Sequence, residues 1–345
     1  MNLRDQCWNL HGDQRENLHS IRMEVFLLKN FEYLHGQIAI LNSRGLIVPD
    51  YKQAKQYLLT NNYYNIINGY SKYFMDGQNT YITGATFDEI THLYYFDKEI
   101  KYTLFRAITE AENHIKSILA YRFSEVYNNK PYAYLDINCY DNSKTLELGW
   151  LISRLTRIIN NNKNSKNNNS IKHHVKKHND VPIWVLIDYL DFGEMNALIK
   201  NLPVSVQNNI AKNSCSFVSD NISMTTPFTP ETMISFTENI RQVRNICAHN
   251  NKLLDSRCKA DVKFYPDLHS IYGISRNSKR NDVYNVFISL QCFLSKTQYA
   301  QLHNTIRKRI ITLDNRLNTI KVNTILNSLG FPKDWHRKTP SLKQN

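Results

Sequence analysis

Two side chains in the later half of the chain have the types and spacing for acid–base chemistry on a phosphate. Arg244 and His249 lie five positions apart, and Asn245 directly follows the arginine. An arginine keeps its charge at any physiological pH, whereas an imidazole titrates near neutrality. The cation can hold a phosphate while the imidazole moves a proton, as a metal-independent ribonuclease requires. Arg244, Asn245 and His249 are therefore the candidate catalytic residues, and this chemistry requires no metal and no cofactor.

The spacing alone is weak support, because Arg4 and His11 also fit it within a polar leader that lacks an apolar period. Around Arg244, in contrast, apolar residues recur at helical intervals and predict an amphipathic helix over about 231–250. The stripe consists of Phe236, Ile240, Val243 and Cys247. Thr232 or Thr237 could cap the start of this helix, and Asn250-Asn251 suit its end.

The geometry of a regular helix separates the two chemical groups. Arg244 lies beside the apolar stripe, whereas His249 points roughly 140° away from it at about 3.6 residues per turn. His249 instead shares a row with Asn245 and Arg241. One helix can focus both groups on a phosphate only if its end unwinds, so we expect two copies to meet about a twofold axis as a homodimer. In the alternative interpretation, Arg244 pairs with a buried acid such as Glu238 or Glu112, and His249 caps the helix end.

The charge of the chain favours a polyanionic partner. The formal net charge is +13 and the isoelectric point is near 9.3, which favours nucleic acid over an acidic small molecule. The six cysteines are scattered without a CxxC pair, which argues against a zinc ribbon or a disulfide framework and suits a reducing cytoplasm. Residues 1–20 are polar and no apolar run approaches about 18 residues, so we expect a soluble cytoplasmic protein without a membrane span.

Helical periodicity dominates the chain and predicts an all-α fold with decorating loops and short strands. A capping-box pattern at Thr86–Glu89 opens a spine helix that reaches about Phe123, with Lys101 on its apolar side as a possible bend or notch. A short strand is possible at Tyr81-Ile82, and residues 203–230 look less regular. We expect a polar leader over 1–30, a single helical domain over 31–330, and a basic tail over 331–345.

A segment rich in asparagine and lysine interrupts the helices at about 160–180. Seven of the ten residues 160–169 are asparagine, so the segment is expected to be a disordered cationic insertion. His174 and His178 stand at i, i+4, but only Asp180 adds a donor at ligand spacing, so no metal site is expected. The candidate RNA-binding residues are Arg241, Lys163, Lys166, Lys172, Lys176, Lys177, Arg276, Lys279 and Arg280.

Four stretches together resemble the bacterial abortive-infection proteins of the AbiD/AbiF type. They are Asn61–Tyr70, Thr86–Asp97, Pro182–Gly193 and Arg244–His249, and the segment Leu41–Leu46 also fits. The resemblance covers about residues 33–257, and four motifs in order are more specific than any one of them. Each motif also has an ordinary interpretation, with the aromatic residues in the core and Gly69 and Gly193 at turns or helix ends.

The resemblance implies the helical HEPN fold, in which an Arg-x(4–6)-His motif near a helix end forms a composite ribonuclease site across a dimer. It carries Arg244, Asn245 and His249 onto that motif, and it implies a phage-defence toxin that cleaves RNA. The group is similar to the RNA-guided type VI CRISPR nucleases, so a structured non-coding RNA that guides or restrains the toxin is an implied partner. Similar sequences often have a second histidine and a tryptophan after the motif, where this chain has Asn250 and Leu254.

Three functions follow as competing hypotheses. The first is a metal-independent endoribonuclease with RNA as its substrate. The second is a non-catalytic RNA-binding protein of a phage-defence or toxin–antitoxin system, in which Arg244 and His249 contact phosphate or have structural roles. The third is a protein-interaction scaffold that does not bind RNA, which predicts no salt-dependent affinity for RNA.

Overall fold

The computed structural model describes residues 31–343 and confirms the all-α prediction. Two isolated bridges, Ile47 with Thr86 and Met75 with Tyr81, are the only strand-like pairings in this range. The expected strand at Tyr81-Ile82 is therefore reduced to a bridge. The expected leader over 1–30 lies outside the described residues, as do Cys7 and the Arg4/His11 pattern.

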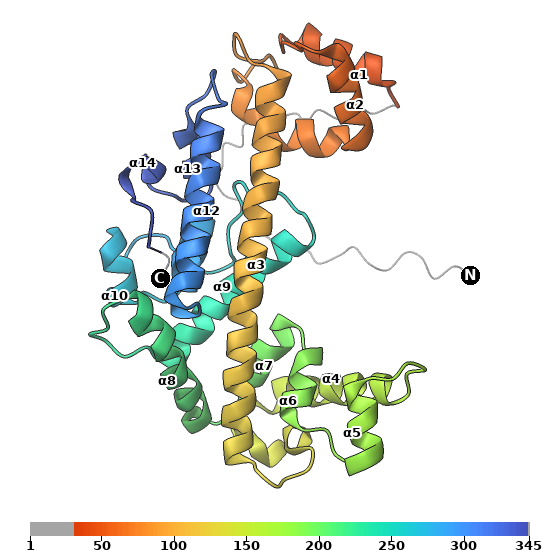
Figure 1. Cartoon of the computed structure of the whole chain (residues 1–345), viewed down its shortest axis with the longest axis vertical. Helices are drawn as coiled ribbons and strands as arrows, with labels where there is room; N and C mark the ends of the chain where they lie inside the picture. The colour runs from red at the N-terminus through yellow and green to blue at the C-terminus, as the bar shows by residue number, and fades with distance from the viewer. Residues whose placement is uncertain (1–30, 344–345) are drawn as a thin grey trace.

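Helix α3 (Phe87–Val126) is the spine against which the rest of the fold is arranged, as Figure 1 shows. Its 40 residues span about 60 Å at the usual rise of an α-helix. The predicted capping box is present, because Thr86 accepts from the Glu89 backbone while the Glu89 carboxylate accepts from Thr86. One stripe of α3 is buried along nearly its whole length, from Phe87 to Phe123.

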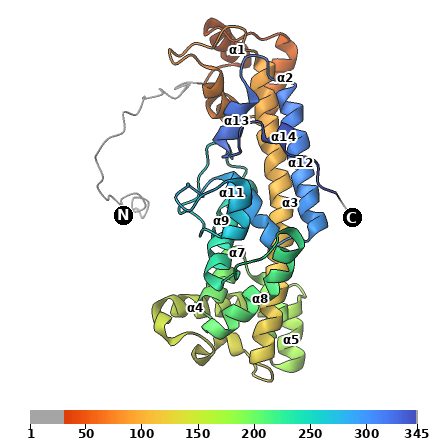
Figure 2. The same cartoon turned by 90° about the vertical axis from the view of Figure 1, so that its left-hand side faces the viewer.

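The upper end of the spine carries the first elements of the chain. Helices α1 (Leu34–Ser43) and α2 (Tyr51–Thr60) lead into a π-helical turn η1 (Tyr64–Asn68) and a 3-10 turn η2 (Ser71–Phe74). Helix α12 (Lys296–Asp314) runs alongside the same part of α3 in both views (Figures 1 and 2). The shorter C-terminal helices α11 (Val283–Ser289), α13 (Val322–Ser328) and α14 (Trp335–Lys338) complete this half.

Helix α8 (Val204–Asn221) occupies the region where the sequence analysis expects irregular structure. Its asparagine and serine residues have low helix propensity, which conceals it at the sequence level. In the fold, Val206, Ile210, Ala211 and Val218 are buried, and α8 packs against α3 and α9. Tertiary burial therefore overrides local preference at this helix.

The lower half contains α4 (Thr145–Lys163), α5 (Ser170–His178), α6 (Ile183–Leu186) and α7 (Phe192–Asn201). The expectation of a disordered insertion over 160–180 is corrected here, since α4 and α5 occupy most of that segment. Ile171 is fully buried, so the segment does contribute to the core. Asn169 caps α5 by accepting from the Lys172 backbone at 2.8 Å, and its amide donates to the Asn162 carbonyl. The asparagines thus act as caps and turn residues.

Helix α9 (Pro230–Ala248) packs against the spine and carries Arg244 and Asn245, and His249 directly follows it. The predicted stripe is confirmed, since Phe236, Ile240, Val243 and Cys247 are all buried. The predicted caps Thr232 and Thr237 are wrong, because both lie inside the helix. Thr229 caps the start instead, with Pro230 as the first helical residue, where its missing N–H costs nothing.

A buried ion pair on α3 fixes the end of α9. The side chains of Asp97 and Lys101 are 0% and 3% exposed, with the ammonium 3.1 Å from the carboxylate. Lys101 Nζ also donates to Asn250 Oδ1 at 2.8 Å and to the Asn251 carbonyl at 3.1 Å. The expectation of an exposed notch at Lys101 is therefore wrong, because Lys101 is buried and these acceptors compensate for burying its charge.

Replacing Lys101 by methionine should destabilise the fold by about 3–5 kcal/mol, because Asp97 would keep a buried charge without its cation. Urea unfolding of the full chain measures this change. The matched control is Lys130→Met, since Lys130 pairs with Asp136 on the surface and its loss should leave the unfolding midpoint close to that of the parent. Equal midpoint shifts in the two variants would contradict the structural role of the buried pair.

Acid should weaken the fold through His269, the last residue of helix α10 (Pro266–His269), which is fully buried beside the rings of Phe236 and Phe264. Burial, reinforced by the charge of Arg280, lowers the pKa of His269 to about 4. In the unfolded chain the pKa of this histidine is near 6.5, so acid protonates the unfolded state first. The free energy of unfolding is therefore highest above about pH 6.5 and falls by about 3 kcal/mol as the pH drops to 4. Urea midpoints of the parent and His269→Gln at pH 7 and pH 4.5 test this, since the variant should depend less on pH.

Candidate functional site

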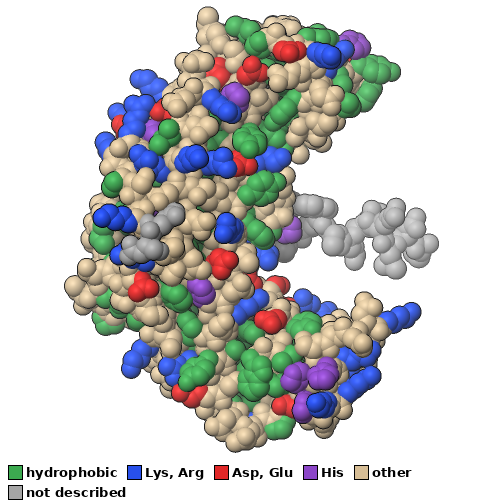
Figure 3. Space-filling view, viewed as in Figure 1, with side chains coloured by type: hydrophobic (Ala, Val, Ile, Leu, Met, Phe, Trp, Pro, Cys, Tyr) green, Lys and Arg blue, Asp and Glu red, His purple; other side chains and the backbone are tan. Residues whose placement is uncertain are grey.

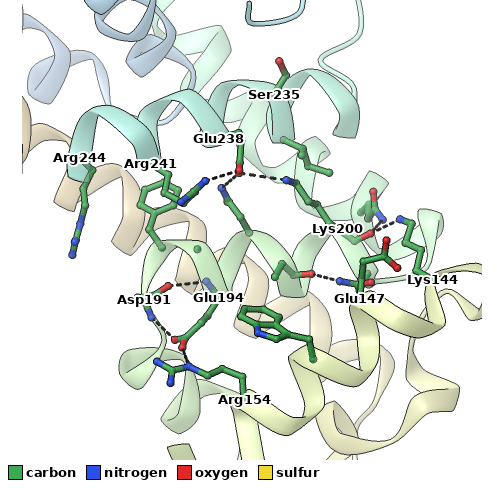
Figure 4. A pocket seen from close by; sticks show the side chains of 18 of the residues that line it. Lys144, Glu147, Arg154, Asp191, Glu194, Lys200, Ser235, Glu238, Arg241 and Arg244 are labelled. Atoms are coloured by element: carbon green, nitrogen blue, oxygen red, sulfur yellow. Dashed lines mark hydrogen bonds and ion pairs between the residues drawn. The ribbon is translucent and has the colours of Figure 1, made fainter. Parts of the chain in front are cut away.

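A groove of about 1480 Å³ lies between α4, α7, α8 and α9 (Figure 4). Arg244, Asn245 and His249 all line it, together with Arg241 and Glu238 from the preceding turns of α9. Helix α7 packs against both α4 and α9 and separates them. The three candidate catalytic residues therefore share one groove within a single protomer.

Helix α9 ends directly before His249. The helix stops at Ala248, and His249 is the C-cap with φ −88° and ψ 7°. Asn250 then takes a left-handed conformation with φ 52°, which asparagine tolerates better than most residues. The His249 amide still donates to the Asn245 carbonyl at 3.0 Å, so His249 keeps its helical position and the backbone turns away only after it. The expected angular separation of Arg244 and His249 therefore remains, and both line the groove because it is wide.

Arg244 is held in place by a charge and a ring. Its side chain is 29% exposed, its Nε lies 3.9 Å from Glu112 Oε2, and its guanidinium carbon lies 5.6 Å from the Phe105 ring centroid. Glu112 is itself paired with Lys116 at 2.9 Å. The alternative pairing with Glu112 is therefore present, whereas the one with Glu238 is not.

The hydrogen-bonding capacity of Arg244 remains unused within residues 31–343. The distance of 3.9 Å to Glu112 exceeds a hydrogen bond, and the buried Nε has no acceptor. His249 is exposed, and its side chain likewise contacts no hydrogen-bond partner in that range. Both side chains therefore keep donors or acceptors for a ligand, while the nearby ring and carboxylate restrict Arg244.

A network on the α7 side fixes the next turn of α9. Glu238 accepts from Arg241 at 2.8 Å and from Asn196 at 3.0 Å, and it pairs with Lys200 at 3.3 Å. Burial alone would raise the pKa of Glu238, but the Arg241 hydrogen bond and the charge of Lys200 outweigh it and lower the pKa. Arg241 does line the groove, as expected of an RNA contact, although one of its nitrogens is committed to Glu238.

The first turn of α7 lies next to Arg154 of α4 and Arg241 of α9. Asp191 and Glu194 form a capping box, and Glu194 also accepts from Arg154 of α4 (Figure 4). A Cβ on Gly193 would lie 3.2 Å from Asp191 Oδ1 and 3.6 Å from Arg241 Cδ. The glycine therefore leaves room mainly for the capping carboxylate of Asp191, whereas Arg241 would meet a Cβ at an ordinary contact distance.

Most of the other candidate RNA-binding residues lie outside the groove. Lys163, Lys166, Lys176 and Lys177 are exposed, and lysines and histidines gather on the lower lobe in Figure 3. Lys172 is partly committed, because its ammonium donates to the Ser165 carbonyl at 2.6 Å.

Arg276 and Lys279 are exposed, as a phosphate contact requires, whereas Arg280 is only 9% exposed. The guanidinium of Arg280 donates to the carbonyls of Val262, Ser275, Arg276 and Ser278. The expectation that Arg280 contacts RNA is therefore wrong, because this arginine is used to hold its own loop together.

Metal ligation finds no support in the histidine pair of α5. The rings of His174 and His178 are 5.5 Å apart, but Asp180 is engaged by the Tyr132 backbone at 2.9 Å. Between residues 31 and 343, no three histidine, cysteine, aspartate or glutamate side chains gather where they could hold a metal ion.

The wall of the groove that α4 provides was not predicted from the sequence. Glu147, Trp150, Arg154 and Arg157 line it at helical spacing, opposite the buried stripe of Leu148, Leu151 and Leu155. The signal was available in the sequence as an exposed aromatic residue interleaved with arginines on one helical face. Nothing in the sequence alone, however, placed α4 opposite α9.

Comparison with known proteins identifies the family. The model of the Abi-like protein family matches residues 56–255, more than half of the chain, from α2 to the turn after α9. The chain therefore belongs to the Abi-like family, and this membership supports a role in abortive infection, a defence against phage. No curated protein and no solved structure matches the chain. None of the helices between residues 31 and 343 has the length and apolar character needed to cross a bilayer.

The structural role of Arg280 can be separated from nucleic-acid binding by stability measurements. Arg280→Ala should lower the free energy of unfolding by about 3 kcal/mol, because buried carbonyls would lose a charged donor. Arg276→Ala is the matched control, since this exposed guanidinium only lies over the Phe264 ring and should contribute less than about 1 kcal/mol. Thermal or urea unfolding measures both, and a stable Arg280→Ala protein would contradict the assignment.

Proposed function

We propose that this Abi-like protein is a metal-independent endoribonuclease whose catalytic groups are Arg244, Asn245 and His249. The observation that carries the proposal is their common position on one groove, with a histidine at the helix end and an arginine whose hydrogen-bond donors are unused. The basic charge of the chain supports RNA as the substrate. The resemblance to HEPN ribonucleases adds a precedent for this pair of residue types.

The proposed reaction is an attack of the ribose 2′-hydroxyl on the adjacent phosphorus. His249 removes the 2′-hydroxyl proton or protonates the leaving 5′-oxygen, and Arg244 stabilises the charge that develops on the phosphorane. Asn245 holds a phosphate oxygen or orients one of the other two residues. The products carry a 2′,3′-cyclic phosphate and a 5′-hydroxyl.

A second copy of the chain completes this proposal. Each protomer brings one histidine to the reaction, whereas a base and an acid are both required for rapid transesterification. His249 is exposed at a helix end, so a twofold partner can approach it. We therefore include a homodimer in the proposal, and a structured RNA as the partner that guides or restrains cleavage.

The second candidate function is RNA binding without cleavage. One observation favours it: Glu112 already lies beside Arg244 and offsets part of its charge. The two positions that depart from similar sequences also have structural roles here. Asn250 accepts from Lys101, and Leu254 is buried at 2% exposure.

Purified protein incubated with labelled RNA in the presence of EDTA tests the nuclease proposal. The parent should cleave and leave 2′,3′-cyclic phosphate ends, whereas Arg244→Ala and His249→Ala should each lose at least about a hundredfold in rate. Both variants should remain folded, because neither side chain is part of the buried core.

Matched controls for these variants are His35→Ala and Arg316→Ala. Both alter exposed residues that do not line the groove. Both should cleave like the parent. RNA bound without strand scission by the parent would favour the second function, and undiminished cleavage by His249→Ala would remove the histidine from its proposed role.

A further inference from the structure

We infer that the groove between α4, α7 and α9 holds a single-stranded stretch of RNA, with one base stacked on the indole of Trp150. This inference rests on the proposed function in taking RNA as the ligand, and it adds the form of the substrate and the residues that grip it. Its starting observation is that Trp150 is 57% exposed and lines the groove.

Helix α4 presents an aromatic side chain between cations on one face. Trp150, Arg154 and Arg157 line the groove at intervals of four and three residues, so they form a continuous row. The opposite face is buried, which leaves the indole no core to fill. An exposed aromatic ring beside arginines is the usual platform for an unpaired base and its phosphates.

The groove is lined by more cations than carboxylates. Seven lysine and arginine residues line it against five carboxylates: Lys144, Arg154, Arg157, Lys200, Arg241, Arg244 and Lys263 against Glu147, Asp191, Glu194, Glu231 and Glu238. Two of the carboxylates are engaged in ion pairs within the groove, Glu194 with Arg154 and Glu238 with Lys200 and Arg241. Lys144 and Arg244 lie near Asp141 and Glu112, at 3.8 and 3.9 Å. Arg157 and Lys263 are exposed and form no ion pair among the described residues, so these two cations are available to a phosphate.

The size of the groove favours a polymer, and the tryptophan favours a single strand. A volume of about 1480 Å³ exceeds the roughly 300–1,000 Å³ typical of small-molecule pockets. In an A-form duplex the bases are paired and stacked on one another, so none is free to stack on a protein side chain. An unpaired segment can turn a base onto Trp150 while its backbone passes the arginines toward Arg244 and His249.

Binding should be measured with the full-length His249→Ala protein, so that cleavage does not interfere, and a labelled single-stranded RNA of about ten nucleotides. In that background Trp150→Ala should weaken binding about tenfold or more, whereas Trp150→Phe should retain most of it. Arg157→Gln should reduce the slope of log affinity against log salt by roughly 0.7. A duplex of the same sequence should bind with no dependence on Trp150.

The matched control is Trp184→Ala, because Trp184 is exposed to a similar extent, 59%, but lines other surface hollows and not this groove. It should bind like the background protein. Equal affinities of the Trp150→Ala and Trp184→Ala proteins for the single strand would overturn the inference. Competition by an acidic peptide at the same concentration as RNA would also overturn it, in favour of a protein ligand.

These outcomes distinguish the groove from the nuclease. Trp150-dependent binding by a parent that never cleaves would support the groove and reject the proposed reaction. Cleavage by the parent with an unchanged KM in Trp150→Ala would support the reaction and reject the groove as the place where the substrate strand lies.

Discussion

The buried ion pair between Asp97 and Lys101 is the constraint on which the position of the candidate site depends. An isolated charge in the interior is costly, so each member must be satisfied by further polar groups. Asp97 receives the Tyr70 hydroxyl at 2.8 Å and the Leu253 and Leu254 amides, while Lys101 is taken up by the residues just beyond α9. The hydrogen bonds that satisfy these two buried charges therefore hold residues 250–254, the segment directly after His249.

A second pair on the same helix does comparable work about four turns further along. Glu112 contacts Lys116 and lies beside Arg244, and Lys116 donates to the Leu190 carbonyl at 2.7 Å, one residue before the cap of α7. The four stretches that resemble abortive-infection proteins thus meet along α3. Two of them end at the first pair through Tyr70 and Asp97, and the other two approach the second pair through Leu190 and Arg244. The four stretches therefore share a structural role, contact with the two ion pairs of α3, and need not have four separate functions.

The sequence was sufficient for features set by local pattern and insufficient for those set by distant partners. The capping box at Thr86, the length of the spine and the buried stripe of α9 depend on neighbours within a few residues, and each is confirmed. The asparagine-rich segment was misjudged because its composition does not reveal that Ile171 packs into the core. Arg280 was misjudged because a basic residue in a loop does not reveal that its guanidinium turns back onto three carbonyls of that loop and onto the Val262 carbonyl. The groove wall on α4 was missed because helical periodicity gives the face of a helix and not its partner.

Position 250 shows how closely backbone and side-chain demands coincide beside the candidate site. Its backbone is left-handed, which glycine accepts freely, and its amide oxygen also receives the buried ammonium of Lys101. Glycine would satisfy the first demand and leave the ammonium short of an acceptor. A β-branched residue would satisfy neither. Asparagine combines both properties in a short side chain. A substitution at position 250 would therefore alter the turn and so displace the neighbouring His249 imidazole, although Asn250 itself is not one of the proposed catalytic residues.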